Sequence, residues 1–248
     1  MSKPLAKLEK LLSYNFQDLR LLERAVTHRS WAYEKLAGGE EVEIRNLHNE
    51  TLEFIGDSVL GLAVAELLYK NNPTLSEGDL TLMKHYLVSM ETLAVAAKEI
   101  GLGKFMLVGK GEEKTGGRRK QALLADTLEA IIAAIFFDSG YVNARNFVSR
   151  ILCEEFQKVT PTSSIDYKTL LQETLQAERR TAPIYKLVET EGPPHKRTFL
   201  VEAVWDSGKT KGKGNSIKSA EMEAANLALK KLQTESNKIT TSNVLKTL

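Results

Sequence analysis

Cysteine and long apolar runs are scarce in this sequence, and each scarcity excludes a class of structure. Cys153 is the single cysteine, which excludes an intramolecular disulfide and a cysteine-based zinc cluster. No apolar run approaches the roughly 18 residues that a membrane span needs, and the N-terminus lacks the apolar core of a secretion signal. We therefore expect a cytoplasmic protein in a reducing compartment, without a membrane partner.

An excess of charge of one sign is also lacking. The sequence has 34 basic and 32 acidic residues, a formal net charge of +2. Because binding to a polyanion depends on where positive charge gathers, this small sum neither indicates nor excludes a nucleic-acid partner. With 248 residues, 42% of them hydrophobic, the chain can bury a substantial core and is long enough for two domains.

The hydrophobic period changes once along the chain. Over residues 1–156, apolar side chains recur at three- and four-residue steps, which predicts an all-α domain. Residues 157–165 lose this period and gain threonine, serine and proline, which predicts a linker. Residues 166–234 predict a second domain with the order α-β-β-β-α, and residues 235–248 form a polar tail without a motif or a period.

Local signals divide the first domain further. Ser76 predicts the start of a helix, and Gly101 predicts its end. Residues 108–120 read as a glycine- and charge-rich loop. Residues 121–140 then predict a long, apolar helix.

Acidic residues interrupt an otherwise apolar helix predicted over residues 49–70. Glu50, Glu53 and Asp57 lie there, with no lysine or arginine before Lys70. An isolated carboxylate on an apolar face is costly to desolvate unless it takes up a proton or gains a positive partner. The neighbouring sequence supplies no such partner.

The apolar helix over residues 121–140 repeats this pattern with Asp126 and Glu129. These two acids are three residues apart, and Glu53 and Asp57 are four apart, so each pair shares one helical face. If the two helices pack together, the carboxylates converge, and two unit charges about 4 Å apart repel by roughly 4 kcal/mol at an effective dielectric near 20. A hard cation, Mg²⁺ first, would neutralise them, as would protonation. The alternative is that all four are solvated surface acids.

At these residues the sequence resembles ribonuclease III, the bacterial endoribonuclease specific for double-stranded RNA. The stretches that carry the resemblance are HNETLEFIGDSVL at 48–60, EGD at 77–79, RRKQALLADTLEAIIAAIFFDSG at 118–140 and THRS at 27–30. The α-β-β-β-α unit is similar to the family's double-stranded RNA-binding domain. The resemblance covers nearly the whole chain and implies a multidomain fold, with an all-α nuclease domain ahead of an RNA-binding domain of mixed α/β structure.

The resemblance also implies roles for the acids. Glu53, Asp126 and Glu129 would bind Mg²⁺, with Mn²⁺ as a candidate substitute, and Asp57 and Glu129 would be catalytic. It further implies a homodimer, cleavage to 5′-phosphate and 3′-hydroxyl ends, and work in ribosomal, messenger and transfer RNA processing. Whether one or two metal ions act stays open.

Two further acids, Glu50 and Glu77, match positions that the family places near the cleavage site or the dimer contact. A structural role is the alternative, because Glu77 would suit the first turn of a helix capped by Ser76. The signature departs from the family at Thr51, where arginine is usual, and at Ala122, where serine is usual.

Double-stranded RNA is read mainly by its shape, through phosphates and 2′-hydroxyls along one face of the protein. The second domain offers polar groups on its first helix, on the loop between its first two strands, and in a lysine-rich stretch that we expect to gather at the start of its last helix. Ile217 stands where the family has a basic residue. The predicted RNA-binding residues are Gln172, Glu173, His195, Lys211, Lys213 and Lys218.

Other chemistries are less well supported. The four histidines show no spacing for a catalytic triad or a metal site, and the glycine-rich stretches do not fit a nucleotide-binding loop, so we expect no nucleotide cofactor. Two alternatives remain: a non-catalytic binder of structured RNA, and a metal-dependent phosphohydrolase acting on small nucleotides. The first would not need unpaired acids, and the second would not need an RNA-binding unit.

Overall fold

Two long apolar helices, α5 (Glu50–Asn71) and α9 (Gln121–Ser139), form the centre of the N-terminal part of the chain. Their main chains touch, because a Cβ atom added at Gly56 would lie 1.9 Å from the carbonyl oxygen of Glu129. Both helices bury most of their apolar side chains in one continuous core. This contact fixes how the residues of one helix lie relative to those of the other.

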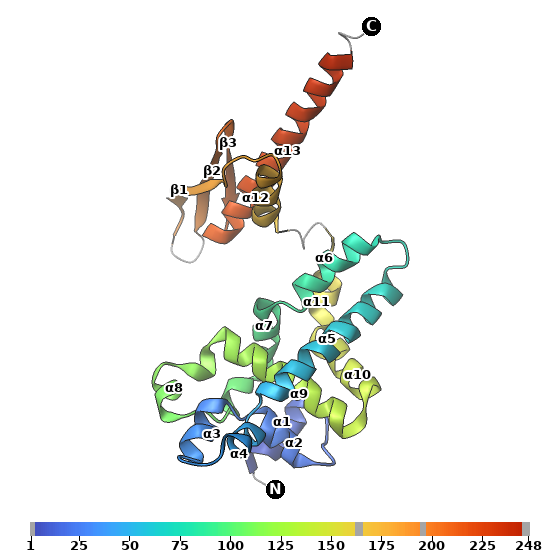
Figure 1. Ribbon diagram of the computed structural model, residues 1–248, viewed down its shortest axis with the longest axis vertical. Helices are drawn as coiled ribbons and strands as arrows, with labels where there is room; N and C mark the ends of the chain where they lie inside the picture. The colour runs from blue at the N-terminus through green and yellow to red at the C-terminus, as the bar shows by residue number, and fades with distance from the viewer. Residues whose placement is uncertain (1–2, 162–165, 194–196, 245–248) are drawn as a thin grey trace. The chain divides into compact units, whose positions relative to one another are not determined.

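The computed structural model describes residues 3–161, 166–193 and 197–244, with side chains for 5–161, 166–193 and 197–232. The chain divides into two compact units, Met1–Ser164 and Ile165–Leu248 (Figure 1). In the first unit, helices surround α5 and α9: α1 (Lys3–Leu12), α2 (Leu19–Ala25), α3 (Arg29–Lys35), α4 (Glu41–Leu47), α6 (Glu77–Leu87), α7 (Met90–Ile100), α8 (Lys110–Lys114), α10 (Tyr141–Ile151) and α11 (Cys153–Lys158), with 3-10 turns η1 (Leu102–Lys104) and η2 (Gly117–Arg119).

Serine caps explain where two of these helices begin. Ser76 and Asp79 form a capping box at the start of α6, in which each side chain accepts from the other residue's main-chain N–H. Ser89 caps α7 in turn by accepting from the main-chain N–H of Thr92. The single helix predicted between Ser76 and Gly101 is therefore two helices. Gly101 ends the second at a φ of 74°, a left-handed conformation that suits glycine.

The predicted loop over residues 108–120 is also more ordered than expected. It contains the short helix α8 and the turn η2. Arg118 holds this segment in place, because its guanidinium donates to the main-chain carbonyls of Gly103 and Met106. These contacts join segments that are distant in the sequence, so local pattern alone did not indicate them.

The second unit has the predicted order: α12 (Tyr167–Ala177), β1 (Ile184–Glu191), β2 (Thr198–Trp205), β3 (Gly208–Gly214) and α13 (Ile217–Val244). The strands form one antiparallel sheet in the order β1-β2-β3. Val201, Ala203 and Trp205 are buried, as their alternation along β2 predicts. The fold class, an all-α unit followed by an α-β-β-β-α unit, is confirmed.

The end of α13 differs from the expected polar tail. Its backbone stays helical to Val244, although residues 235–244 show no helical period in the sequence. No glycine or proline interrupts this stretch, and extending an existing helix costs far less than starting one. The remaining tail residues 245–248, and residues 162–165 of the predicted linker, lie outside the described residues. None of the helices in the described part of the chain combines the length and apolar content that crossing a bilayer requires.

Candidate active site and RNA-binding surface

Three carboxylates converge where α5 crosses α9. Glu53 lies on α5, and Asp126 and Glu129 lie one turn apart on α9. Each offers an oxygen atom, and these oxygens all lie within 4.8 Å of one another. They line a cleft of about 720 Å³, which we call the acidic cleft, together with His28, Arg29, Glu50, Phe54, Asp57 and Glu112.

The acidic cleft disfavours its own negative charges. Burial raises the pKa of Glu129 to about 8, and the neighbouring charges of Asp57, Glu53 and Asp126 add to the effect. Burial also raises the pKa of Glu53, followed by the charge of Asp126. The pKa of Asp126 is raised by burial as well. A cation bound among the three would relieve these costs, because opposite charge favours the ionised carboxylates.

The donor set indicates which cation would fit. The three ligating groups are all carboxylates, the hard oxygen donors that Mg²⁺ and Mn²⁺ accept. Asp57 follows Glu53 by one turn of α5 and lines the same cleft. Its charge is the largest electrostatic contribution to the raised pKa of Glu129. The structure thus brings together the four acids that the sequence singled out as a cluster.

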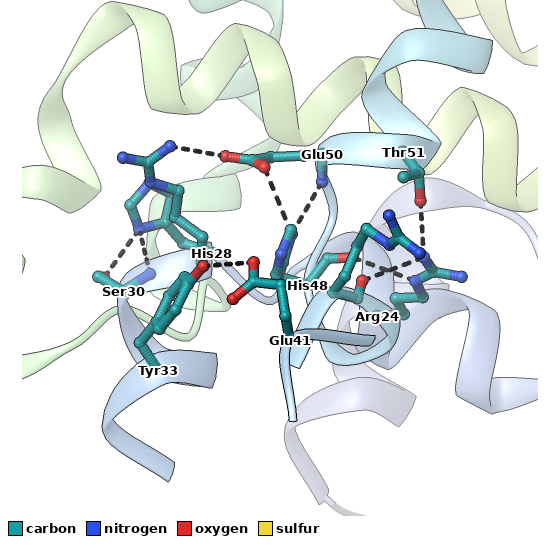
Figure 2. Close-up of polar contacts among 10 residues, drawn as sticks. Arg24, His28, Ser30, Tyr33, Glu41, His48, Glu50 and Thr51 are labelled. Carbon is teal, nitrogen blue, oxygen red and sulfur yellow. Dashed lines mark hydrogen bonds and ion pairs between the residues drawn. The ribbon is translucent and has the colours of Figure 1, made fainter. Parts of the chain in front are cut away.

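Glu50, by contrast, has the positive partner that the neighbouring sequence did not show. Nη1 of Arg29, the first residue of α3, lies 3.0 Å from Oε1 of Glu50. The partner comes from a different helix, so the sequence next to Glu50 does not show it. Figure 2 shows Glu50 next to His48, whose Nδ1 accepts from the main-chain N–H of Glu50 at 3.4 Å.

His28 lies at this site although its sequence context suggested only a structural or surface role. It lines the acidic cleft, and its Nδ1 caps α3 by accepting from the main-chain N–H of Ser30. Figure 2 shows this contact between His28 and Ser30. Ser30 Oγ in turn accepts from the N–H of Gly109 at 2.8 Å. Glu112 of α8 was not predicted either. Both reach the cleft by long-range packing, which sequence spacing does not encode.

The departures from the signature have local partners. Thr51 Oγ1 accepts from Arg24 Nη2 at 2.6 Å, and Arg24 Nε donates to the carbonyl of His48 at 3.1 Å (Figure 2). An arginine guanidinium therefore lies beside position 51, but α2 supplies it. Ala122 lies in the first turn of α9 and is exposed.

Glu77 lies apart from the cluster. It is the first residue of α6 and accepts from Thr81 Oγ1 at 3.0 Å. It lines a separate pocket with Leu68, Tyr69 and Lys84, among others. Of the two further acids, the structure brings only Glu50 to the acidic cleft, and Glu77 has the first-turn position that its structural interpretation predicted.

In the second unit, a pocket of about 560 Å³ joins the starts of α12 and α13. It is lined by Gln172 of α12 and by Ile217 and Lys218 of α13, among others. A link between the two helices underlies it: Lys168 Nζ lies 2.6 Å from Glu221 Oε2 and 4.7 Å from the ring centre of Tyr185. We call this feature the interhelical groove. Glu173 follows Gln172 on α12 and is exposed.

Lys211 and Lys213 lie elsewhere on this unit. Thr210 Oγ1 donates to the carbonyl of Ala224 on α13, and a Cβ at Gly212 would lie 2.2 Å from the main-chain nitrogen of the same residue. Thr210 and Gly212 therefore face α13, and the alternation of β3 turns both lysines to the opposite face of the sheet. The lysine-rich stretch does not gather at the start of α13. His195 lies outside the described residues.

Comparisons with known proteins match both units. A model of the "Ribonuclease-III-like" family matches residues 18–156, and a model of the "Double-stranded RNA binding motif" matches residues 167–232. Ribonuclease 3 of Nitratidesulfovibrio vulgaris is 42% identical over 225 residues, which cover 90% of this chain and 86% of that protein. Ribonuclease 3 of Oleidesulfovibrio alaskensis is 42% identical over 93% of this chain and 98% of its own.

Solved structures agree with the sequence comparisons. The crystal structure of the nuclease domain of ribonuclease III from Campylobacter jejuni is 36% identical, with a TM-score of 0.55, and covers 64% of this chain and 99% of its own. A second structure of that nuclease domain, 37% identical with the same TM-score, covers 62% of this chain and 99% of its own. Its description concerns flexibility in a region involved in dimer formation.

Proposed function

The chain belongs to the ribonuclease III family of double-stranded RNA-specific endoribonucleases, and we propose that it cuts its substrate with Mg²⁺ held by Glu53, Asp126 and Glu129. The observation that carries this proposal is the convergence of three carboxylate oxygens within 4.8 Å. Mn²⁺ has the same preference for oxygen ligands and would substitute. The expected products carry 5′-phosphate and 3′-hydroxyl ends.

Each acid has a part in the proposed reaction. When bound, the ion would lower the pKa of a coordinated water and offset negative charge on the scissile phosphate. Glu129 would hold the ion in its ionised form, as a ligand from α9. Asp57 lies beside the ligands and would accept a hydrogen bond from the attacking water. No nucleophilic side chain is needed, because water would attack the phosphorus directly while its bond to the 3′ oxygen breaks, and that oxygen takes up a proton to leave as the 3′-hydroxyl.

The second unit supplies affinity for the duplex. Gln172 and Glu173 on α12 face the minor groove, and Lys218 pairs with a phosphate near the start of α13. The interhelical groove supports this assignment because it brings Gln172 and Lys218 together. Lys211 and Lys213 belong to the other face of the sheet, and we do not include them in this contact.

We propose a homodimer in which each acidic cleft cuts one strand. Three large apolar side chains of α5 support this: Phe54 is 73% exposed, Leu62 58% and Tyr69 72%. Apolar surface of this kind on one helix is typical of a protein contact.

The expected substrates are precursors of ribosomal, messenger and transfer RNA, and we expect the protein to work in the cytoplasm.

The alternative of a non-catalytic RNA binder is less well supported by the site. A binder of a polyanion gains nothing from carboxylates held together at a cost in free energy, and that cost is visible in the raised pKa of Glu129. A phosphohydrolase for small nucleotides would leave the double-stranded RNA-binding motif without a role.

One experiment tests the proposed function. A long RNA duplex is incubated with the parent and with Glu129→Ala, in Mg²⁺ and then in a chelator. We expect metal-dependent cutting by the parent, and binding with at least a hundredfold loss of cutting by the variant. Glu99→Ala, which removes an exposed acid on α7, is the matched control and should cut normally. Equal cutting by parent and Glu129→Ala, or none by the parent, would reject the proposal.

A further inference from the structure

The acidic cleft has an excess of negative charge that a polyanionic substrate must approach. Six of its lining residues are acids: Glu50, Glu53, Asp57, Glu112, Asp126 and Glu129. Among the described residues that line it, the permanent positive charge belongs to Arg29. A phosphate needs a permanent positive charge beside the cluster in order to enter the acidic cleft.

The Arg29 side chain is accessible as well as charged. It is 62% exposed, and its contact with Glu50 joins one nitrogen, Nη1, to one oxygen at 3.0 Å. A guanidinium has five N–H donors in a planar fork that matches two phosphate oxygens. A single-point contact with an exposed carboxylate is weak in water, so an RNA phosphate can replace Glu50 as its partner.

The main chain around Arg29 is held from two sides. Asn49, just ahead of α5, donates its N–H to the carbonyl of Thr27 at 3.0 Å. On the other side His28 donates to the carbonyl of Leu107 at 2.9 Å, next to the parallel bridge between Thr27 and Leu107. The start of α3 is thus tied to the start of the helix that carries Glu53. This connection fixes the main chain of Arg29 relative to the carboxylate cluster before any RNA arrives.

We propose that Arg29 binds a phosphate of the strand being cut, next to the carboxylate cluster, and that Glu50 holds the guanidinium in place until RNA displaces it. The inference rests on the proposed function, because it takes the acidic cleft as the cutting site. It adds a substrate-binding residue to the metal ligands.

Steady-state cutting of a defined RNA duplex by the full chain tests this proposal. A charge-assisted contact with a phosphate is worth roughly 10- to 100-fold, so Arg29→Ala should lose about that factor in kcat/KM. Arg29→Lys, which keeps the charge but not the fork, should recover part of it. Arg20→Ala is the matched control: Arg20 also pairs with an acid, Asp18, at 2.8 Å, and is 89% exposed on α2. It should retain parent activity.

Neutral phosphates distinguish a substrate contact from a merely structural role. Methylphosphonate is placed at each phosphate flanking the scissile bond in turn, and kcat/KM is measured for parent and Arg29→Ala. If Arg29 binds one of these phosphates, neutralising that position costs the parent about 10- to 100-fold but costs the variant almost nothing. Additive losses at every position, or no loss from Arg29→Ala, would overturn the proposal.

Failure of the proposed function would be recognised separately. In that case the parent would not cut the unmodified duplex in Mg²⁺. Parent and Arg29→Ala are then compared by the dissociation constants of the same modified duplexes, measured with chelator present. This comparison tests whether Arg29 binds a phosphate. Non-additivity at one phosphate supports the contact, and additivity at all of them rejects it.

Discussion

Three features of the structure meet at the Glu129 side chain. It is partly buried at the contact between α5 and α9, it belongs to the group of converging oxygens, and the charges of three other acids act on it. Its pKa is raised to about 8 from an ordinary value of 4.5. In the absence of a metal ion, the folded protein therefore holds a proton on Glu129 over a pH range in which the unfolded chain has released it.

This proton predicts that stability depends on pH in chelator and much less on pH in saturating Mg²⁺. Between about pH 4.5 and pH 8 the native state binds more protons, so in chelator the stability should fall as pH rises, by at most about 1.4 kcal/mol per pH unit for one proton. Mg²⁺ would bind the ionised carboxylate, so the stabilisation by saturating Mg²⁺ should grow over the same range and offset this fall. Thermal melting from pH 5 to pH 9 in both conditions measures this.

Glu129→Gln supplies the control, because it cannot lose a proton. Its melting temperature in chelator should vary less with pH than that of the parent. Identical slopes for the two proteins would show that Glu129 is not the titrating group.

Sequence spacing predicted which acids could meet but not which cations would join them. The sequence alone predicted that Glu53 and Asp126 meet, because each lies on an apolar helix beside small residues. Arg29 could not be assigned to Glu50, since their contact depends on how α3 lies against the start of α5. Residue pairs within one helix are encoded locally, and pairs between helices are not.

At the scale of elements, the contact between α5 and α9 positions the candidate site. Gly56 allows it, because any side chain there would collide with the main chain of Glu129. Main-chain atoms cannot rotate away as a side chain can. The two helices would have to separate, which would also move Glu53 away from Asp126 and Glu129.

Gly56→Ala should therefore reduce both stability and metal binding. We expect a loss of about 1–3 kcal/mol in the free energy of unfolding, as for other overpacked cores, measured by urea denaturation. Mg²⁺ should then raise the melting temperature less than it does in the parent. Gly61→Ala on the same helix is the control, since its nearest neighbours are side-chain atoms of Lys84 at 3.7 Å. Equal effects of the two changes would contradict the assignment to helix packing.

Element types were predictable to a greater extent than element ends. The apolar periods of α5 and α9 and the alternation along β2 indicated the correct structures. The break between α6 and α7 depends on Ser89, one of many serines in the sequence, and only its contact with Thr92 identifies it as a cap. Contrary to the sequence prediction, the lysines of β3 do not gather at the start of α13. The packing of Gly212 on α13 decides which face of the sheet they take, and the sequence pattern does not show this packing.

At the scale of the whole molecule, the change of hydrophobic period predicted two different units. Each unit has its own buried core, the first built on helices and the second on a sheet with two helices. The proposed division of labour assigns cutting to the first and most of the affinity for the duplex to the second.

Deleting residues 160–248 should separate these two contributions. We expect the affinity for RNA to fall roughly 10- to 100-fold at moderate salt, because the phosphate and 2′-hydroxyl contacts of the second unit are lost. At low salt and saturating RNA, the cutting rate should stay within a few-fold of the parent. Binding and single-turnover cutting by the truncated chain measure the two effects. Loss of cutting at saturating RNA would contradict this division.

The ligands of the proposed ion come from helices that are distant in the sequence and that pack closely where Gly56 meets Glu129. A nascent or partly folded chain has both acidic segments but no common place where they can hold a metal. Under the proposed mechanism, cutting would therefore begin only after α5 has packed on α9.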